Sequence, residues 1–278
     1  TTENLGIMGD KPTHPELLDW LAVEFMDRKW DLRHMVRLIV NSETYKQSGA
    51  FTDAKLEKDP RNRLLSRGPR YRLDAEQVRD TALAASGLLV RKVGGPSVRP
   101  YQPENIWSDV AMPQSNTRFY TADKGEGLYR RSMYTFLKRS APHPMMLNFD
   151  ATAREVFCTR RERSNSPLQS LNLLNDVQFV EASRILAERL LKEAKDDASR
   201  VDRLSWLLLS RPATAAEHKV FARSLAAFRA DYAANPAEAA KLAKAGDKPV
   251  DPKLPPVEVA AWTLVCSQML NRDETLNK

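Results

Sequence analysis

Apolar side chains recur every three or four positions over much of this chain, which is the spacing of one helix face. The first such run covers residues 15–28 and starts after Thr13. Asp31 can cap a second run, which we expect to end near Gly49. The short link between the two runs favours an antiparallel helical hairpin. The shared apolar face of the first run consists of Leu17, Leu18, Leu21, Ala22 and Phe25.

Capping residues mark the later helix starts. Asp74, with a glutamine three residues on, starts a helix that the glycines at 94 and 95 end. Ser166, followed by proline and then Gln169, starts a helical stretch to residue 191, with a fresh start at Asp176. Further helices are predicted over 201–209, 214–232 and 257–270.

The helical period is lost between residues 96 and 140. Prolines punctuate this long loop, and its aromatic side chains must pack somewhere, as in functional loops. Alternation over 128–138 favours one short strand. Residues 235–256, rich in Ala, Lys and Pro, are expected to be a solvated excursion.

These patterns predict an all-α fold, an irregular helical domain with a long central loop rich in proline and aromatic residues and room for one short strand pair. We expect a single domain over 1–278, cut from a larger protein. Its sub-regions are a helical part (1–95), an irregular part rich in arginine and aromatics (96–165) and a second helical part (166–278).

Composition narrows the function classes. The chain has 278 residues, with 43 Lys and Arg against 36 Asp and Glu, a net charge of +7. Nucleic-acid binding is not expected, because the basic residues form no dense stripe with aromatics. The sequence contains no apolar run long enough for a transmembrane segment, and no signal peptide is recognisable at its start.

The cysteines and histidines suggest no metal centre. Cys158 and Cys266 form no Cys-x-x-Cys pair and no haem-attachment motif, so we expect buried free thiols, with a disulfide between them as the alternative. Each histidine is isolated from metal-binding motifs. His143 has two methionines close behind it, a combination that ligates haem iron elsewhere, but the attachment motif is missing.

The densest polar cluster lies between Tyr129 and Asp176, where arginines outnumber acidic residues. Guanidinium groups suit carboxylate, phosphate or sulfate ligands, although they can equally pin the irregular segment to helix ends. Asp150 and Glu155 are the candidate acid–base residues, and amides on one helix face either contact a ligand or satisfy a loop backbone. The ligand-binding candidates are Tyr101, Tyr129, Arg131, Arg161, Arg163, Gln169, Asn172, Asn175 and Asp176.

Three segments carry a family resemblance: GGPSVRPYQP at 94–103, LYRRSMYTF at 128–136 and RERSNSPLQ at 161–169. Shorter matches are HPELLDWL at 14–21 and LND at 174–176. Together they make the chain similar to the C-terminal domain of unknown function number fifteen fifty-three of large planctomycete and verrucomicrobial proteins. The chain departs from many relatives at Val177, where they have proline, which affects a helix start and not a function.

The resemblance implies a parent protein that is exported to the periplasm or cell envelope. In it, a cytochrome-c-like domain and a second planctomycete-type domain precede this one, and we expect the chain to begin inside the family domain. Haem c is then expected only upstream, with no cofactor in this chain. Other domains of the parent protein are the expected partners, with anionic polysaccharide as a further one.

Two functions remain open from the sequence. The first is a non-catalytic interaction or scaffolding module, which the missing motifs and the helical build favour. The second is a carbohydrate-active hydrolase or oxidoreductase-associated domain with an arginine-rich site for an anionic substrate. They differ in whether the polar groups between Tyr129 and Asp176 converge on an open pocket or are used inside the protein.

Overall fold

The computed structural model describes residues 3–4, 6–50 and 52–278. The chain divides into two compact units: unit 1 is Thr1–Arg72 with Lys278, and unit 2 is Leu73–Asn277. Within the described residues there are thirteen α-helices, and the only β structure is isolated single-residue bridges, which confirms the mostly helical prediction. None of these helices is both long and apolar enough to cross a bilayer. The single-domain prediction stays a prediction.

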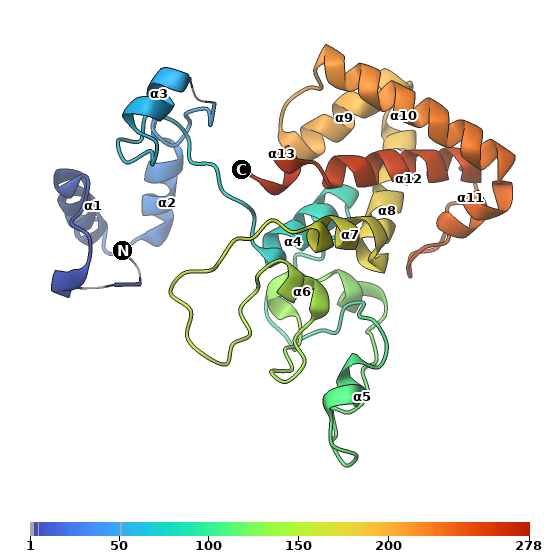
Figure 1. The fold of residues 1–278 in the computed structure, drawn as a ribbon, viewed down its shortest axis with the longest axis horizontal. Helices are drawn as coiled ribbons and strands as arrows, with labels where there is room; N and C mark the ends of the chain where they lie inside the picture. Colours follow the sequence, from blue (N-terminus) through green and yellow to red (C-terminus); the bar gives the residue numbers. More distant parts are fainter. Residues whose placement is uncertain (1–2, 5, 51) are drawn as a thin grey trace. The chain divides into compact units, whose positions relative to one another are not determined.

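Unit 1 contains the 3₁₀ helix η1 (Gly6–Met8) and the helices α1 (Pro15–Asp27), α2 (Leu32–Val40) and α3 (Asp53–Lys58) (Figure 1). The predicted cap is confirmed, because the Asp31 side chain accepts two backbone N–H groups of the first turn of α2. The predicted end of this helix near Gly49 is wrong. The Ser42 hydroxyl donates to a carbonyl at the end of α2 and accepts the Tyr45 N–H, and such local bonds compete with a continuing helix.

Unit 2 is built around α8, which packs against α12 and α4, while α12 also packs against α10 and α11. Leu186 and Trp262 are fully buried at its centre. Because α12 is apolar on nearly all sides, it lies inside the unit rather than on its surface. The helices of unit 2 are α4 (Ala75–Ser86), α5 (Ile106–Val110), η2 (Gly125–Tyr129), η3 (Ser132–Tyr134), α6 (Pro144–Asn148), α7 (Pro167–Asn175), α8 (Val177–Glu193), α9 (Asp197–Leu209), α10 (Ala215–Ala234), α11 (Pro236–Leu242), α12 (Pro256–Leu270) and α13 (Asp273–Leu276).

Several sequence expectations for unit 2 need correction. The helix predicted from Asp74 ends at Ser86, because Gly87 adopts a left-handed conformation that terminates it before the glycines at 94 and 95. Residues 128–138 form no strand but two 3₁₀ turns beside isolated bridges. The expected excursion at 235–256 contains α11, whose Ala239 is fully buried.

The thiols are free in the structure, so the disulfide alternative is wrong. Cys266 is buried, as expected, and burial raises its pKa. Cys158 is exposed, contrary to the expectation of two buried thiols.

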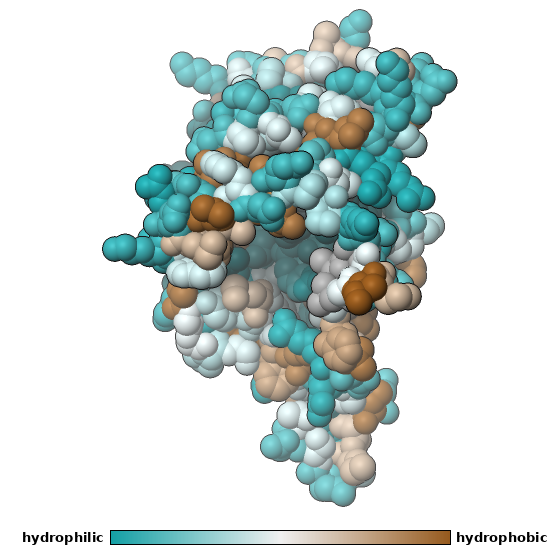
Figure 2. Space-filling view, turned by 90° about the vertical axis from the view of Figure 1, so that its left-hand side faces the viewer, coloured by the Kyte–Doolittle hydropathy of each residue, from teal (hydrophilic) through white to brown (hydrophobic). Residues whose placement is uncertain are grey.

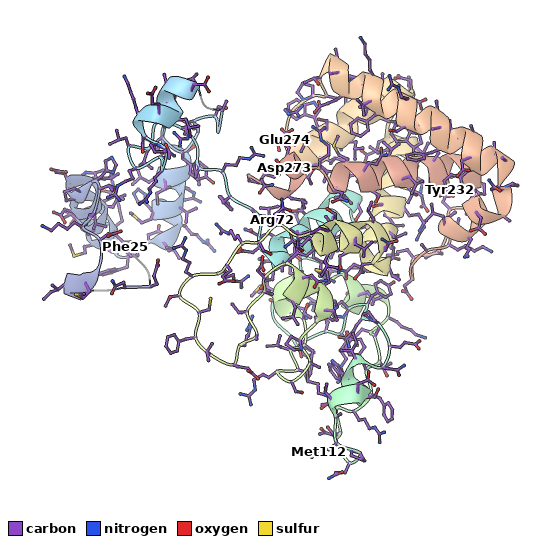
Figure 3. The ribbon with its side chains drawn as sticks, in the orientation of Figure 1. Phe25, Arg72, Met112, Tyr232, Asp273 and Glu274 are labelled. Atoms are coloured by element: carbon purple, nitrogen blue, oxygen red, sulfur yellow. The ribbon has the colours of Figure 1, made fainter. Side chains whose placement is uncertain are left out.

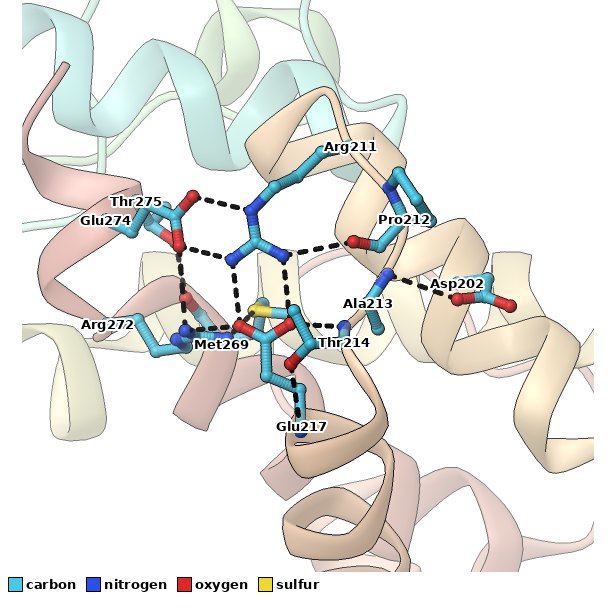
Figure 4. A network of polar contacts seen from close by, with 10 residues as sticks. All are labelled: Asp202, Arg211, Pro212, Ala213, Thr214, Glu217, Met269, Arg272, Glu274 and Thr275. Carbon is cyan, nitrogen blue, oxygen red and sulfur yellow. Dashed lines mark hydrogen bonds and ion pairs between the residues drawn. The ribbon is translucent and has the colours of Figure 1, made fainter. Parts of the chain in front are cut away.

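An arginine-centred network joins the ends of four helices in unit 2 (Figure 4). Arg211, which follows α9, donates to both carboxylate oxygens of Glu217 in α10 and of Glu274 in α13. Arg272, just after α12, also lies 2.6 Å from Glu217. The hydrogen bonds from Arg211 hold the pKa of Glu217 well below its usual range. Figure 3 shows side chains along the neighbouring α10, with Tyr232 near its end, and Met112 at the far tip of the loop after α5.

Candidate functional site

The residues singled out by the sequence lie in unit 2, most of them in two polar clusters. The first surrounds Glu181 of α8 and includes Tyr101 and Tyr129. The second ties residues 150–164, called here the arginine segment, to α6 and α7. The hydrogen bonds of these two clusters show whether the predicted site residues face an open pocket or bond to one another inside the protein.

Glu181 is completely buried, and each of its carboxylate oxygens accepts a hydrogen bond from a phenol. The Tyr101 hydroxyl donates to Oε2 at 3.0 Å, and the Tyr129 hydroxyl donates to Oε1 at 2.9 Å. Burial, together with the charge of Glu181, raises the pKa of Tyr101 to about 12 and also raises that of Tyr129. Both phenols are therefore protonated donors at neutral pH, and both are used inside the protein.

The same carboxylate fastens the loop between α11 and α12. The backbone N–H of Lys248 donates to Oε1 of Glu181 at 2.8 Å. The buried guanidinium of Arg184 donates to two carbonyl groups of this loop at 2.9 and 2.8 Å. Gly246 packs directly on Glu181, so that a Cβ at this position would overlap the carboxyl group. The cluster therefore holds the loop against α8, with the backbone of Gly246 packed on the carboxyl group.

A second buried arginine, Arg79 of α4, supports the turns η2 and η3. Burial lowers its pKa to about 10, so it remains charged at neutral pH. Its guanidinium donates four hydrogen bonds, to the carbonyl oxygens of Leu128 (2.6 Å) and Arg130 (2.7 Å), to Oγ of Ser132 (3.1 Å) and to Oε1 of Gln178 (2.8 Å). Arg79 thus positions the backbone on either side of the candidate Tyr129.

The sequence pattern does not single out Arg79, Glu181 or Arg184. One signal could have found them, namely charged residues inside otherwise apolar helices. Glu181, Arg184 and Glu188 follow each other at spacings of three and four along α8, half of whose other residues are buried. Buried charges of this kind are almost always paired.

In the second cluster, the Asp150 carboxylate accepts the backbone N–H of Ser164 at 2.7 Å and its hydroxyl at 2.8 Å. The buried side chain of Gln169 donates to the carbonyl of Asn148 at 2.8 Å and to the Ser164 hydroxyl at 3.2 Å. Asn172 accepts a hydrogen bond of 2.9 Å from the Asn148 amide. Gln169 thus bonds to the backbone at the end of α6, and a ligand contact of this residue stays a prediction.

The arginines of this segment face acidic residues at the start of α4. Arg161 makes two hydrogen bonds to Glu76, at 2.6 and 3.0 Å, and the Arg163 guanidinium lies 3.6 Å from the Asp74 carboxylate. Burial acts to raise the pKa of Glu76, but the bonds and charge of Arg161 outweigh it and lower the pKa. An open hollow of about 1050 Å³ lies along residues 158–164. Its arginines are at least partly neutralised by their neighbours.

The remaining ligand-binding candidates do not line this hollow. Arg131 is half exposed, with its guanidinium 3.9 Å from Asp80. Asn175 donates to a carbonyl one turn earlier in its own helix. Asp176 caps α8 by accepting the N–H two residues on at 2.9 Å, and burial raises its pKa. Each of the three thus has a local partner.

The two catalytic candidates are not brought to a common hollow. Glu155 is exposed and lines a separate hollow of about 620 Å³ with Lys138 and Arg139. Asp150 is not among the described residues that line either hollow. Their joint action as acid and base stays a prediction, and the geometry gives it no support.

Asp150→Ala should loosen the arginine segment. The change removes charge-assisted bonds to Ser164, each of which contributes about 1–2 kcal/mol at a partly exposed site. We expect trypsin to cleave after Arg160 or Arg161 about tenfold faster, because cleavage follows the population of the open segment. Glu155→Ala, an exposed residue without such a bond, is the matched control, and equal cleavage rates in the two variants would contradict this role of Asp150.

His143 is the one buried histidine among the described residues. Its Nε2 donates to the carbonyl of Tyr101 at 2.7 Å, which leaves the lone pair of Nδ1 without a partner among the described residues. The ring lines a small cavity of about 60 Å³ together with Met146. Burial lowers the pKa of His143 to about 4. The ring is therefore neutral at physiological pH.

This buried imidazole makes stability depend on pH. Between about pH 4 and 6.5 the unfolded chain binds a proton at His143 that the folded chain does not bind, so the contribution is complete above pH 6.5 and lost as the pH falls toward 4. The shift corresponds to about 3 kcal/mol. Urea unfolding of the wild type and of His143→Gln should show this extra loss only in the wild type. Parallel pH profiles of the two proteins would contradict it.

No group of three or more His, Cys, Asp and Glu side chains in the described part of the chain is placed to hold a metal ion. The absence of a metal site from this chain stays a prediction.

A further concave surface lies in unit 1, where the sequence predicted none. A groove of about 970 Å³, called here the unit 1 groove, runs between α1, α2 and the loops around residues 41–45 and 64–69. Its lining is mainly apolar, with Leu17, Trp20 and Leu21 from α1, Leu38 and Ile39 from α2, and Tyr45. Pockets of this size and apolar character commonly bind ligands or partner side chains.

Comparison with protein families matches residues 1–225 to one family model, described as PSD1, protein of unknown function (DUF1553). No curated protein and no solved structure matches the chain.

Proposed function

Because the chain belongs to the DUF1553 family of proteins of unknown function, its role must be argued from its own geometry, and we propose that it is an interaction module in which unit 1 binds a partner. The observation that carries the proposal is the apolar surface of α1 and α2. Trp20 and Ile39 are 51% and 45% exposed, and Met35 is the one buried hydrophobic residue among those described in unit 1. Large exposed apolar surfaces on a folded protein mark interaction sites.

Unit 2 supports this assignment by what its polar residues do. Tyr101, Tyr129 and Gln169 are engaged in internal hydrogen bonds, and Arg161 is paired with Glu76. A catalytic or binding site needs such groups directed toward a ligand. Their internal use is what a scaffold requires, so unit 2 serves as the rigid body of the module.

The family resemblance suggests the setting of this role. We propose that the partner is another domain of an exported, multidomain cytochrome-c-type protein of the cell envelope, and that haem c is bound by that other domain and not by this chain. This proposal places no redox or hydrolytic step on the residues described above.

The test is a binding titration of the purified chain against the other domains of its parent protein, produced separately, with the cytochrome-c-like domain first. The double variant Trp20→Ser, Ile39→Ser should bind at least about tenfold more weakly, since each residue would bury apolar surface worth about 1.5–3 kcal/mol. Leu171→Ser changes an exposed leucine of α7 and serves as the control. Equal affinity of the double variant and the wild type, or no binding by either, would overturn the proposal.

A second candidate function is binding of anionic polysaccharide at the arginine segment. The observation that favours it is the open hollow lined by Arg160, Arg161 and Arg163. It is the weaker candidate, because Arg161 is already bonded to Glu76 by both terminal nitrogens.

A further inference from the structure

The unit 1 groove has two helical walls that are joined at one end. A tight turn at residues 28–31 links α1 to α2, the Phe25 and Trp30 rings contact edge to face beside it, and His34 lies 2.7 Å from Glu24 across the two helices. Figure 3 shows Phe25 on the α1 side of this hairpin. The groove therefore lies between the two arms of a hairpin, lined by residues of both.

The two walls present apolar side chains in different ways. On α1, Leu17 lies one turn before Trp20 and Leu21, and all three line the groove. On α2, the adjacent Leu38 and Ile39 line it, and Val36, one turn before Ile39, is 51% exposed outside it. The exposed apolar surface therefore extends beyond the groove itself, which is more than a small molecule would cover. Apolar surface on two neighbouring helices is what a third helix packs against in a helical bundle.

The charged residues that line the groove are all basic. Arg37 and Arg67 lie along it with His14 and His34, and no carboxylate is among the described residues that line it. The Arg67 guanidinium already donates to the carbonyls of Asp59 and Pro60. The Arg37 guanidinium is exposed and has no partner among the described residues. The surface therefore attracts carboxylates at its edge and apolar side chains at its floor.

Figure 2 shows hydrophobic residues set among hydrophilic ones on the face it displays.

We propose that the unit 1 groove binds one acidic amphipathic α-helix of a protein partner. Its apolar side chains, spaced at i, i+3, i+4 and i+7, would lie against Trp20 and Ile39, and its carboxylates would face Arg37. The inference rests on the proposed role of unit 1 as the partner-binding part, and it specifies the chemistry of that partner.

The test uses two fluorescein-labelled synthetic helices of about 16 residues, long enough to be partly helical in water. Both peptides carry leucines at positions i, i+3, i+4 and i+7. The residues beside this apolar face are glutamates in one peptide and lysines in the other. We expect fluorescence anisotropy to show the acidic peptide binding the full chain at least about tenfold tighter at physiological salt.

Arg37→Glu should remove this preference or reverse it. Arg33→Glu, on the same helix but not lining the groove, should leave it unchanged. The Arg37 side chain is exposed and forms no hydrogen bond or ion pair with the described residues, so the variant is expected to fold. Circular dichroism of both variants verifies this.

The outcomes separate the inference from the proposed function. Equal binding of both peptides, abolished by Ile39→Asp, would overturn the acidic helix but leave unit 1 as the partner-binding part. Displacement of a bound peptide by oleate alone, with no peptide preference, would likewise point to a small amphipathic ligand and overturn the helix. Peptide binding that survives both Ile39→Asp and Trp20→Ser, or no peptide binding at all, would overturn the inference as well.

Discussion

Arg79→Met should lower the free energy of unfolding of unit 2 by about 3–5 kcal/mol. The arginine is 99% buried and donates to two carbonyls, a hydroxyl and an amide oxygen, and methionine fills a similar volume without a donor. Four acceptors around η2, η3 and α8 would lose their partner in a site closed to water, and each unsatisfied buried group costs about 1–3 kcal/mol. Relaxation of the turns recovers part of that sum.

The measurement is urea unfolding followed by circular dichroism, with Arg131→Met as the control. Arg131 is half exposed, and its ion pair with Asp80 is long, at 3.9 Å. Its loss should therefore change the free energy of unfolding by less than about 1 kcal/mol. Similar unfolding midpoints for the two variants would show that the four bonds of Arg79 do not support the turns.

Gly246→Ala should destabilise unit 2 by about 2–5 kcal/mol, for two separate reasons. The φ angle of Gly246 is +91°, in the left-handed region, which costs a residue with a Cβ about 1–2 kcal/mol. The added Cβ would also overlap the Glu181 carboxyl group, which cannot move because two phenols and a backbone N–H hold it. Overpacking of this kind adds about 1–3 kcal/mol.

Gly87→Ala separates these two effects. Its φ angle is +85°, but no atom lies within 4 Å of the position of the new Cβ, so the backbone cost is present and the overlap is absent. Thermal unfolding should therefore lower the Tm of Gly246→Ala clearly more than that of Gly87→Ala. Equal Tm values would mean that the Glu181 cluster can yield, and that the loop after α11 is not fixed by it.

Several helix starts could be predicted from the sequence because the signals are local, although the helix predicted over 201–209 begins at Asp197. The capping box of Thr214 and Glu217 and the proline after Ser166 act within one turn, and both helices begin where predicted. The break between α7 and α8 at Asp176 was predictable for the same reason. Two helix ends, near Gly49 and at the glycines 94 and 95, were predicted wrongly, and the short helices were not predicted. The composition of the segment that forms α11 predicted an exposed excursion. Ala239 is nevertheless buried, because α11 packs against α12, and such a tertiary contact is not encoded by local composition.

Some of the polar residues that form the networks of unit 2 could be identified from the sequence, but their hydrogen-bond partners could not. Tyr101 and Tyr129 stand out as aromatics in an irregular segment, but Glu181 is 80 and 52 residues away along the chain. Arg79 is similarly distant from the turns that it supports, since Leu128 follows it by 49 positions along the chain. Spacing along a chain does not report such pairs, so the sequence could not tell a ligand site from an internal network.

In unit 1 the sequence predicted a helix correctly but did not show what covers its apolar face. The apolar period of residues 15–28 predicts a helix face that packs on a core, and the helix is present. Leu17 and Leu18 on that face are nevertheless 46% and 54% exposed. Periodicity identifies an apolar face but not what covers it, and the covering surface is what the proposed partner would supply.

The distinction between an internal network and a ligand site in unit 2 is tested most directly by the Tm of the chain in the presence of sulfated and neutral glycans at physiological salt. If the polar residues between Tyr101 and Asp176 serve the fold, the Tm stays within about 1 °C of the glycan-free value. A ligand that engaged the arginine segment at concentrations well above its Kd would raise the Tm by about 5 °C or more. Such a rise, present in the wild type and absent in Arg161→Ala, would contradict the assignment of unit 2 as a scaffold.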